Sequence, residues 1–471
     1  MALRLTSKHG GFVQAPRSVI SSRSGDNSQE KWLLKTCRLL RDNEWPSDRR
    51  LHIDGSSSFP PSSDIERRDV AHLAFLDALM QNNTVTMATL RNITFCHEQC
   101  QSSLEKILSC STKLRSLKLD NVSINADVQN DENNDTNNSR ANNTGRGILP
   151  HALFQNLHIE ELVVENCTMN QEEMNELAQM IHHSKSLTKL KLLNVSISDT
   201  VTTTKVSKAL NTSTSNITHL DLSQTKLGKE RFIEMLTSLQ SNTTLESLIL
   251  DDCEMHVEYA THIAILLRNN SSMKELSLNG NTFDSESIRV IVQDGLRSNS
   301  SVTTLSLNGN PIGDNGAIHL ANLLCDQSTV SNIQSLSIID CEIWTRGYHE
   351  IALGIATMNR LQELMVDGTE MEEHSQTLLK SIKQNMVLRK LVMAQSNVYM
   401  LEHDEDGDTT WKQIFWYLNL NRIGRRQILQ KQNISAKLWS HVLQCSTNHP
   451  DYLFYMLQHK PEFCGCATST D

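Results

Sequence analysis

The 471-residue sequence is poor in aromatic residues and contains no long apolar run. Tryptophan, tyrosine and phenylalanine make up 5% of the chain, whereas hydrophobic residues as a whole make up 38%. This balance favours many thin layers packed by leucine and isoleucine over one thick, aromatic-rich core. No stretch approaches the roughly 18 consecutive apolar residues of a membrane-spanning helix, so we expect no membrane partner.

Positive charge is also scarce. The formal net charge is -10 at pH 7, and no run of lysine and arginine is long enough to form a basic arm. Because the phosphates of nucleic acids are bound by basic surfaces, we expect no nucleic-acid partner.

The N-terminal segment 1–30 lacks the apolar core of a secretory signal. The eleven cysteines are an odd number scattered through the chain, which is typical of reduced thiols. We therefore expect a soluble, cytoplasmic protein. The segment 1–25 carries four basic side chains, many serines and no acid, so an organelle transit peptide is the alternative to a disordered start.

Motifs for catalysis and for metal binding are missing. The sequence has no phosphate-binding GxxxxGK[ST] loop, no GxSxG elbow and no HExxH helix. The acidic run Asp404–Asp408 differs from a calcium loop in its early glycine and in the missing glutamate at the twelfth place. The cysteines of the segments 96–100 and 464–466 lack the second pair of ligands that a zinc site needs. We expect no enzyme activity, no cofactor and no metal.

One pattern recurs eleven times. It begins as VTMATLRNI at Val85, continues for example as IEELVVENC at Ile159 and MKELSLNGN at Met273, and ends as LRKLVMAQS at Leu388. Successive copies start at a nearly constant spacing of a little under thirty positions, except for one longer gap between Leu114 and Ile159. In each copy the apolar residues alternate with period two and then recur at helical spacing, which predicts a strand followed by a helix.

A strand and a helix of this size cannot bury their apolar faces alone, so neighbouring copies must stack. The predicted fold class is α/β: a solenoid, or horseshoe, with parallel strands on the concave face and helices outside. We expect a disordered N-terminus over residues 1–30, an N-terminal helical cap over 31–84, the repeats over 85–400, and a helical C-terminal cap and tail over 401–471.

Residues 124–147 are rich in asparagine and nearly free of apolar residues, so they cannot offset the entropy of ordering. We expect a disordered loop on one rim, which explains the longer gap before Ile159. Before the repeats, Trp32–Leu40 and Asp64–Met80 have helical periodicity, and Leu51–Ile53 could form an extra strand. After them, the aromatic-rich segment Trp411–Phe463 predicts the helical cap.

The ninth position of the motif holds cysteine, asparagine or threonine in seven copies. The chain leaves the strand there, so buried backbone groups lose their ladder partners and a short polar side chain can satisfy them. We therefore interpret these residues as structural, the cysteines included. They are Cys167, Thr225, Cys253, Asn281, Asn310, Cys341 and Thr369.

The stretches NGNPIGDNGAIHLANLL from Asn308 and CEIWTRGYHEIALGIATMNRLQEL from Cys341 resemble leucine-rich repeats of the ribonuclease-inhibitor type. Such repeats also occur in NOD-like receptors and in the activator of the Ran GTPase. The resemblance covers about residues 85–400 and implies binding of a partner on the concave strand face, without the receptors' nucleotide-binding domain. The C-terminal segment is similar to extensions on leucine-rich repeat proteins of unicellular algae, through Leu420, Asn421, Arg422, Gly424, Arg425, Leu438 and Trp439.

Side chains alternate along a strand, so the residues between the leucines of the motif point to the concave face. Acidic residues dominate the middle repeats and predict a binding site for a basic protein. The predicted site residues are Glu161, Glu165, Asp221, Glu246, Asp251, Asp252, Glu275, Asp340, Glu363 and Asp367, joined by Glu160. Basic residues flank them at Arg115, Lys118, Lys189, Lys191, Arg389 and Lys390. The alternative is an acidic face that only keeps the protein soluble.

The sequence therefore predicts a non-enzymatic scaffold for protein–protein interaction. The alternative function is regulation of an enzyme, either as a nuclease inhibitor or as a GTPase activator. A GTPase activator would present an arginine from a rim loop of an early repeat, where Arg91 and Arg115 are the candidates. The oligomeric state stays open.

Overall fold

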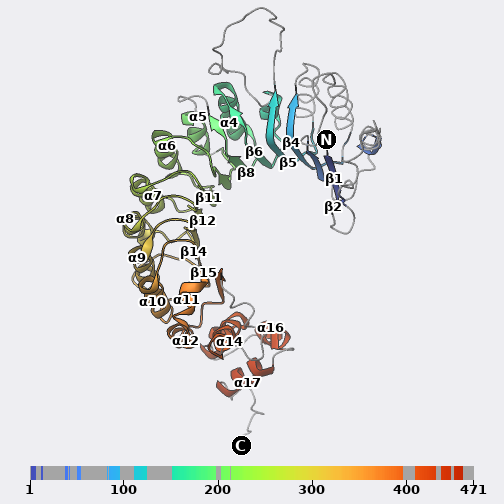
Figure 1. The fold of residues 1–471 in the computed structure, drawn as a ribbon. Helices are drawn as coiled ribbons and strands as arrows, with labels where there is room; N and C mark the ends of the chain where they lie inside the picture. Colours follow the sequence, from blue (N-terminus) through green and yellow to red (C-terminus); the bar gives the residue numbers. More distant parts are fainter. Residues whose placement is uncertain are drawn as a thin grey trace, which may run out of the picture. The chain divides into compact units, whose positions relative to one another are not determined.

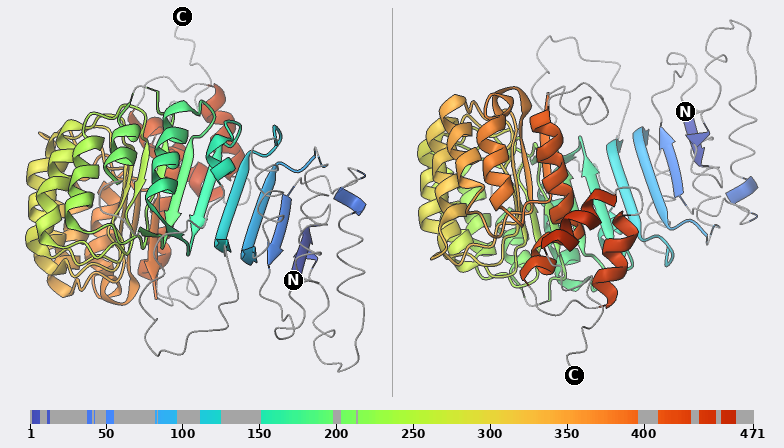
Figure 2. Two further views of the ribbon diagram at one scale, coloured as in Figure 1. Left: turned by 90° about the horizontal axis from the view of Figure 1, so that it is seen from above. Right: turned by 90° about the horizontal axis from the view of Figure 1, so that it is seen from below.

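The structure is a computed structural model. It describes residues 2–6, 12–13, 38–40, 42, 50–54, 82, 84–95, 111–124, 151–197, 203–212, 214–395, 409–430, 436–446 and 450–459. The chain divides into two compact units, Met1–Cys253 and Glu254–Asp471. In each unit strands and helices alternate, and the helices lie on one side of the strands (Figure 1, Figure 2).

The strands of the first unit follow the order β2-β1-β3-β4-β5-β6-β8-β10-β11. All of them from β3 onward pair in parallel, whereas β1 pairs antiparallel with β2 and β3. The strands are β1 (Ala2–Thr6), β2 (Phe12–Val13), β3 (Arg50–Asp54), β4 (Met87–Phe95), β5 (Ser116–Ile124), β6 (Glu161–Glu165), β8 (Lys189–Leu193), β10 (His219–Asp221) and β11 (Ser247–Ile249). Two short strands, β7 (Thr168–Met169) and β9 (Ser196–Ile197), pair separately.

The helices of the first unit are the 3-10 helix η3 (His151–Gln155), α4 (Gln171–His183), α5 (Thr203–Leu210) and α6 (Lys229–Leu239). A reciprocal cap starts α4: the Asn170 side chain accepts from the Glu173 N–H at 3.0 Å, and the Glu173 carboxylate accepts from the Asn170 N–H at 2.7 Å. The face of α4 that carries Met174, Leu177 and Ile181 is buried. Each helix thus supplies the outer half of one repeat's core.

The second unit has five parallel strands in the order β12-β13-β14-β15-β16. They are β12 (Glu275–Ser277), β13 (Thr304–Ser306), β14 (Ser335–Ile338), β15 (Glu363–Asp367) and β16 (Lys390–Ala394). The helices among them are α7 (Val257–Asn269), α8 (Ser285–Val290), η4 (Ile291–Gly295), η5 (Leu296–Ser298), α9 (Gly313–Cys325), α10 (Thr345–Gly354), α11 (Gly368–Glu372) and α12 (Ser375–Gln384).

The strand pairing has the period of the sequence motif. Within the first unit Leu162 pairs with Leu190 and Leu190 with Leu220, and within the second Leu305 pairs with Leu336. These leucines share the fourth position of the motif and are all buried. Each of the eleven motif copies contributes one strand, which begins at the third position of the copy. The predicted α/β class, with parallel strands on one side and helices on the other, is confirmed.

The structural role of the ninth motif position is confirmed at six of its seven residues. Thr225 donates to the Leu192 carbonyl at 2.6 Å, and the Asn310 side chain donates to the Leu278 carbonyl at 2.9 Å. The thiol of Cys341 lies 3.2 Å from the Leu307 carbonyl. All three side chains are buried and link a repeat to the preceding one. The same holds for Cys167, Cys253 and Asn281, whose polar atoms contact backbone groups.

Thr369 departs from this prediction. It is exposed, because α11 begins at Gly368 directly after β15, so the ninth position lies in a helix and not in the loop that follows the strand in other copies. In this repeat the N–H of Asp367, at the end of β15, donates instead to the hydroxyl of the buried Tyr348 at 3.1 Å.

A second set of buried asparagines follows the helices. The Asn385 side chain donates to the carbonyls of Ile355 and Met358, both at 2.7 Å, and accepts from the N–H groups of Val387 and Leu388. Asparagines at the equivalent place in other repeats bond in the same way, among them Asn242 and Asn299. Each one ties the end of a helix in one repeat to the entry of the next strand.

Four helices follow the last repeat: α14 (Thr409–Ile423), α15 (Arg425–Gln430), α16 (Ala436–Ser446) and α17 (Pro450–His459). The helical character predicted for this segment is confirmed. The Asn421 side chain donates to the carbonyls of Asn385 and Leu388, at 3.1 and 2.8 Å, and so continues the asparagine series into α14. Arg425 donates to the Lys383 carbonyl at 2.8 Å and lies over the Tyr417 ring at 4.9 Å. Two residues of the algal-like motif therefore attach these helices to the repeats.

Several predictions concern the first and the inserted segments. The strand considered at Leu51–Ile53 is present as β3, and β1 and β2 lie within the segment 1–30, where we expected no order. Residues 38–40 are helical, as expected, whereas Asp64–Met80 and residues 125–147 lie outside the described residues. No described helix is long and apolar enough to cross a membrane.

Candidate functional site

The candidate site is the strand face, by which we mean the side of each sheet opposite its helices. Along β8 the side chains alternate: Lys189 is exposed, Leu190 is buried, Lys191 is half-buried and Leu192 is buried. The third, fifth and seventh positions of each motif copy therefore lie on this face, as the period of two predicts. Their chemistry determines what the face can bind.

At the β5–β6 part of the first unit, the predicted acids have ionic or hydrogen-bond partners. Glu165 forms an ion pair with Lys118, and Glu161 accepts from the Ser116 hydroxyl at 2.9 Å. Glu160 pairs with Arg115 at 3.1 Å. An acid that already has a hydrogen-bond or ionic partner offers less to a basic ligand, so this part of the face is not an acidic patch.

The two arginines considered for a GTPase activator are engaged within the first unit. Arg91 lies 2.8 Å from the carboxylate of Asp120, which is only 2% exposed and also accepts from the Asn166 side chain at 2.8 Å. Arg115 donates to the Thr112 carbonyl at 2.9 Å in addition to its pair with Glu160. Removing Arg91 would leave a buried carboxylate without its cation, so its position indicates a structural role. Sequence reasoning missed Asp120, although its place in the motif puts it on the strand face.

Acids gather where β10 and β11 end. Asp221 is the last residue of β10, and its carboxylate accepts from the N–H and the hydroxyl of Ser223 at 3.1 and 2.6 Å. Asp251 is half-buried, whereas Asp252 is exposed in a left-handed turn with φ 54°. The negative charges of Asp251 and Asp221 interact electrostatically with the buried thiol of Cys253. Burial above all, and then these two charges, raise the pKa of that thiol to about 12.

The other predicted acids either have partners in the second unit or are half-buried where a strand begins. In the second unit Asp340 lies in a left-handed turn, and its side chain accepts from Gln395 at 2.9 Å. The Asp367 carboxylate accepts from the Asp340 N–H and from the Tyr348 hydroxyl, each at 3.1 Å, and Glu363 pairs with Lys390 at 3.4 Å. Glu246 and Glu275 are half-buried at the entries of β11 and β12. The structure thus brings Asp340 and Asp367 together, but as parts of a structural network.

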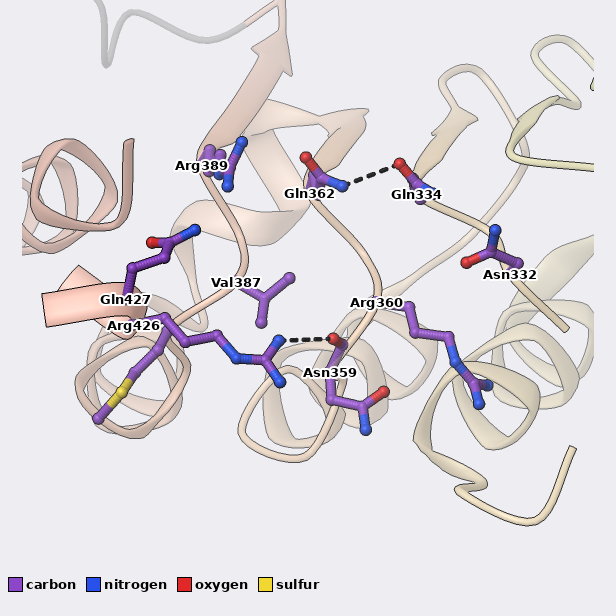
Figure 3. A pocket seen from close by; sticks show the side chains of 10 residues that line it. Asn332, Gln334, Asn359, Arg360, Gln362, Val387, Arg389, Arg426 and Gln427 are labelled. Atoms are coloured by element: carbon purple, nitrogen blue, oxygen red, sulfur yellow. Dashed lines mark hydrogen bonds between the residues drawn. The ribbon is translucent and has the colours of Figure 1, made fainter. Parts of the chain in front are cut away.

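Sequence reasoning missed a basic pocket in the second unit (Figure 3). It is a hollow of about 240 Å³ beside the starts of β14, β15 and β16, and α15 closes one side. Three arginines line it, Arg360, Arg389 and Arg426, together with amides and no carboxylate. The three arginines lie far apart in sequence, and only Arg389 belongs to the motif. A signal in the sequence was the second motif position, which holds Gln334 and Gln362 and no acid in the two copies before Arg389.

No group of three or more histidine, cysteine or acidic side chains is placed to hold a metal ion in the described part of the chain. The cysteine-containing segments 96–100 and 464–466 and the acidic run Asp404–Asp408 lie outside the described residues. Cys167, Cys253, Cys325 and Cys341 are free thiols.

No known protein family matches the sequence. The chain is 24% identical over 262 residues to "NACHT, LRR and PYD domains-containing protein 5" of Mus musculus, and the match covers 50% of this chain and 22% of that protein. The chain therefore spans under a quarter of that relative's length.

Two solved structures are similar at 15% identity. One is the tropomodulin C-terminal domain of Caenorhabditis elegans, with a TM-score of 0.27 over 36% of this chain and 98% of that one. The other is an internalin, inlF, of Listeria monocytogenes, with a TM-score of 0.36 over 74% of this chain and 94% of that one. Because both TM-scores are low, the description of the fold depends on the repeats of this chain and not on these two structures. Eleven motif copies, each with its strand, have the pattern of leucine-rich repeats, and the sequence match to a protein whose name includes LRR supports this interpretation.

Proposed function

We propose that the chain is a non-enzymatic scaffold that binds a partner protein on its strand face. The observation that carries this proposal is the one-sided layering of both units. Helices cover one side of the strands, and among the described residues the strand face presents rows of half-exposed polar side chains between buried leucines. Such a row of side chains on a rigid scaffold is a suitable surface for recognising another protein.

The repeats are of the ribonuclease-inhibitor type in this proposal. The long spacing of the motif copies and a full helix in the outer layer support it, since α4, α7 and α9 each have 13 residues. Shorter repeat types have less chain for the outer layer and often use a short 3-10 segment there.

The centre of binding in this proposal is the group Asp221, Asp251 and Asp252 at the ends of β10 and β11. The acids at β5 and β6 have basic or hydroxyl partners, whereas Asp221 and Asp252 have polar partners and no ion pair among the described residues. Local negative charge of this kind would attract a basic segment of a partner and speed the encounter. The remaining predicted site residues would contribute surface complementarity.

The test is affinity capture from cytosol at low and at high salt. We expect a partner that the wild type retains, that high salt weakens, and that the variant Asp251→Asn/Asp252→Asn loses. Asparagine keeps the shape of aspartate and tolerates the left-handed turn at position 252, so the change removes charge alone.

The matched control is Glu172→Gln/Glu230→Gln, which removes two exposed charges from the helix side of the same unit. It should retain the partner. Equal loss in both variants would mean that net charge matters and not the strand face, and retention by both would refute the acidic centre.

We also propose that the protein works in a reducing compartment such as the cytoplasm. The free cysteines support this, because unpaired thiols are typical of proteins in reducing compartments.

A further inference from the structure

The basic pocket of the second unit has polar groups without partners. Among the described residues, the Arg389 guanidinium has no hydrogen-bond or ionic partner, and neither do the side-chain amides of Asn332 and Gln427. All three are only partly exposed. Donors that line one hollow and have no acceptor in the described part of the protein are available to a ligand that brings its own acceptors.

Other groups hold the pocket in shape. Arg360 donates to the Ser331 carbonyl at 2.7 Å, and Arg426 reaches across from α15 to the Asn359 carbonyl at 3.4 Å (Figure 3). The Gln362 side chain donates to that of Gln334 at 2.8 Å along the neighbouring wall. Arginines fixed to backbone carbonyls keep their remaining N–H groups in a defined direction, which lowers the entropy that a ligand must overcome.

The positive charge of the pocket lining favours an anionic ligand. Three arginines line one hollow whose lining contains no carboxylate, and their like charges repel each other. A protein carboxylate would supply only one charge and two oxygens. A phosphate monoester supplies a charge of roughly -2 and three terminal oxygens, which suits several arginines and amides at once.

The size and chemistry of the hollow argue against a nucleotide. A volume of about 240 Å³ is below the roughly 300 to 1,000 Å³ of sites that enclose whole small molecules. The lining also has no aromatic ring on which a base could stack and no carboxylate that could accept from a sugar hydroxyl. Its apolar members are Met386 and Val387, which suit the short aliphatic link of a small ester.

We propose that this pocket binds a phosphate monoester, with Arg389 as the principal ligand-binding residue. The monoester belongs either to a phosphorylated serine side chain of a partner or to a small phosphorylated molecule. Both sources present the same dianion to the arginines, and they differ in what is attached to it.

The experiment is isothermal titration calorimetry of the full chain with three probes. They are inorganic phosphate, an acetylated Gly-Gly-phosphoserine-Gly-Gly amide, and the same peptide without its phosphate. We expect saturable binding of one molecule of phosphopeptide or phosphate per chain and no binding of the unphosphorylated peptide. Tighter binding of the phosphopeptide than of inorganic phosphate assigns the protein source, and the reverse order assigns the small molecule.

The decisive variant is Arg389→Gln, which should weaken binding by at least about tenfold because a charge-assisted hydrogen-bond donor is lost. Arg389→Lys should retain only part of the wild-type affinity, since lysine lacks the planar guanidinium group of arginine. The control Arg346→Gln removes an exposed arginine elsewhere in the unit and should leave affinity within about twofold.

A second pair of variants keeps the test decisive if Arg389→Gln folds poorly. Gln427→Glu places a carboxylate in the lining and should abolish binding, whereas Gln413→Glu makes the same change on an exposed position of α14 and should not. The absence of saturable binding, or equal affinity of the wild type, Arg389→Gln and Gln427→Glu, would overturn the proposal. So would equal binding of the two peptides.

Discussion

Tyr348 and Asp367 exchange two hydrogen bonds in the second unit. The phenol of Tyr348 donates to the Asp367 carboxylate at 3.1 Å, and the Asp367 N–H donates back to the phenol oxygen at 3.1 Å. Burial raises the pKa of Tyr348 well above its usual value. The phenol is therefore a permanent donor, in a repeat whose ninth-position residue, Thr369, is exposed.

We expect Tyr348→Phe to lower the free energy of unfolding by about 1 to 3 kcal/mol, because the substitution keeps the ring but leaves the Asp367 carboxylate and N–H without one partner each in a partly buried site. Urea denaturation measures the change. The control Tyr417→Phe removes a hydroxyl that has no hydrogen-bond partner among the described residues, and it should change stability by less than about 0.5 kcal/mol. Equal effects of the two substitutions would show that the paired bonds contribute nothing.

The buried thiols predict a loss of stability at high pH. The pKa of Cys253 rises from 9.0 in the unfolded chain to about 12 in the fold. The contribution of this thiol to the free energy of unfolding is complete below pH 9. It is lost as the pH rises from 9 towards 12, because in this range only the thiol of the unfolded chain releases its proton. Each such thiol should cost about 1 kcal/mol of stability between pH 9 and pH 10.

The variant Cys253→Thr isolates this effect, since Thr225 fills the same motif position in the preceding repeat and does not ionise in this range. Its unfolding free energy under reducing conditions should fall by about 1 kcal/mol less over the same interval. A pH dependence identical to that of the wild type would mean that Cys253 titrates normally.

Asn385→Ala should destabilise the second unit by about 2 to 5 kcal/mol, because alanine leaves the carbonyls of Ile355 and Met358 buried without a partner. The side chain also accepts from two backbone N–H groups, so four hydrogen bonds are lost in all. Thermal and urea unfolding measure the loss. The exposed Asn315 of α9 provides the control, because Asn315→Ala changes only helix propensity and should be neutral or slightly stabilising.

Arg425→Lys should loosen the C-terminal helices from the last repeat. Lysine cannot donate to the Lys383 carbonyl and lie flat on the Tyr417 ring at the same time. We expect faster amide hydrogen exchange in α14 and α15, by at least about tenfold, with little change in α7 and α9. Arg422→Lys is the control, since Arg422 is exposed and makes one contact of 3.5 Å. Unchanged exchange in Arg425→Lys would mean that Asn421 alone holds these helices.

The sequence by itself determined the repeat and its core. The alternation of leucines in the motif and the constant spacing of its copies are local properties, and neither element can bury its apolar side alone. Stacking in register is then the only arrangement that buries every fourth-position leucine, as the pairing of Leu162 with Leu190 and of Leu305 with Leu336 confirms. The polar ninth position followed from the same logic, because buried backbone groups need partners wherever a strand ends.

Only the tertiary structure decided which surface groups remain available for binding. The ion pair with Lys118 makes the Glu165 carboxylate less available to a ligand. The position of α15 determines which groups surround Arg389. Residues that meet across repeats or across the cap are separated by dozens of positions, so no periodicity in the sequence relates their charges. The burial of leucines is non-directional and follows from composition and spacing, whereas ion pairs and pockets depend on the positions of individual side-chain atoms.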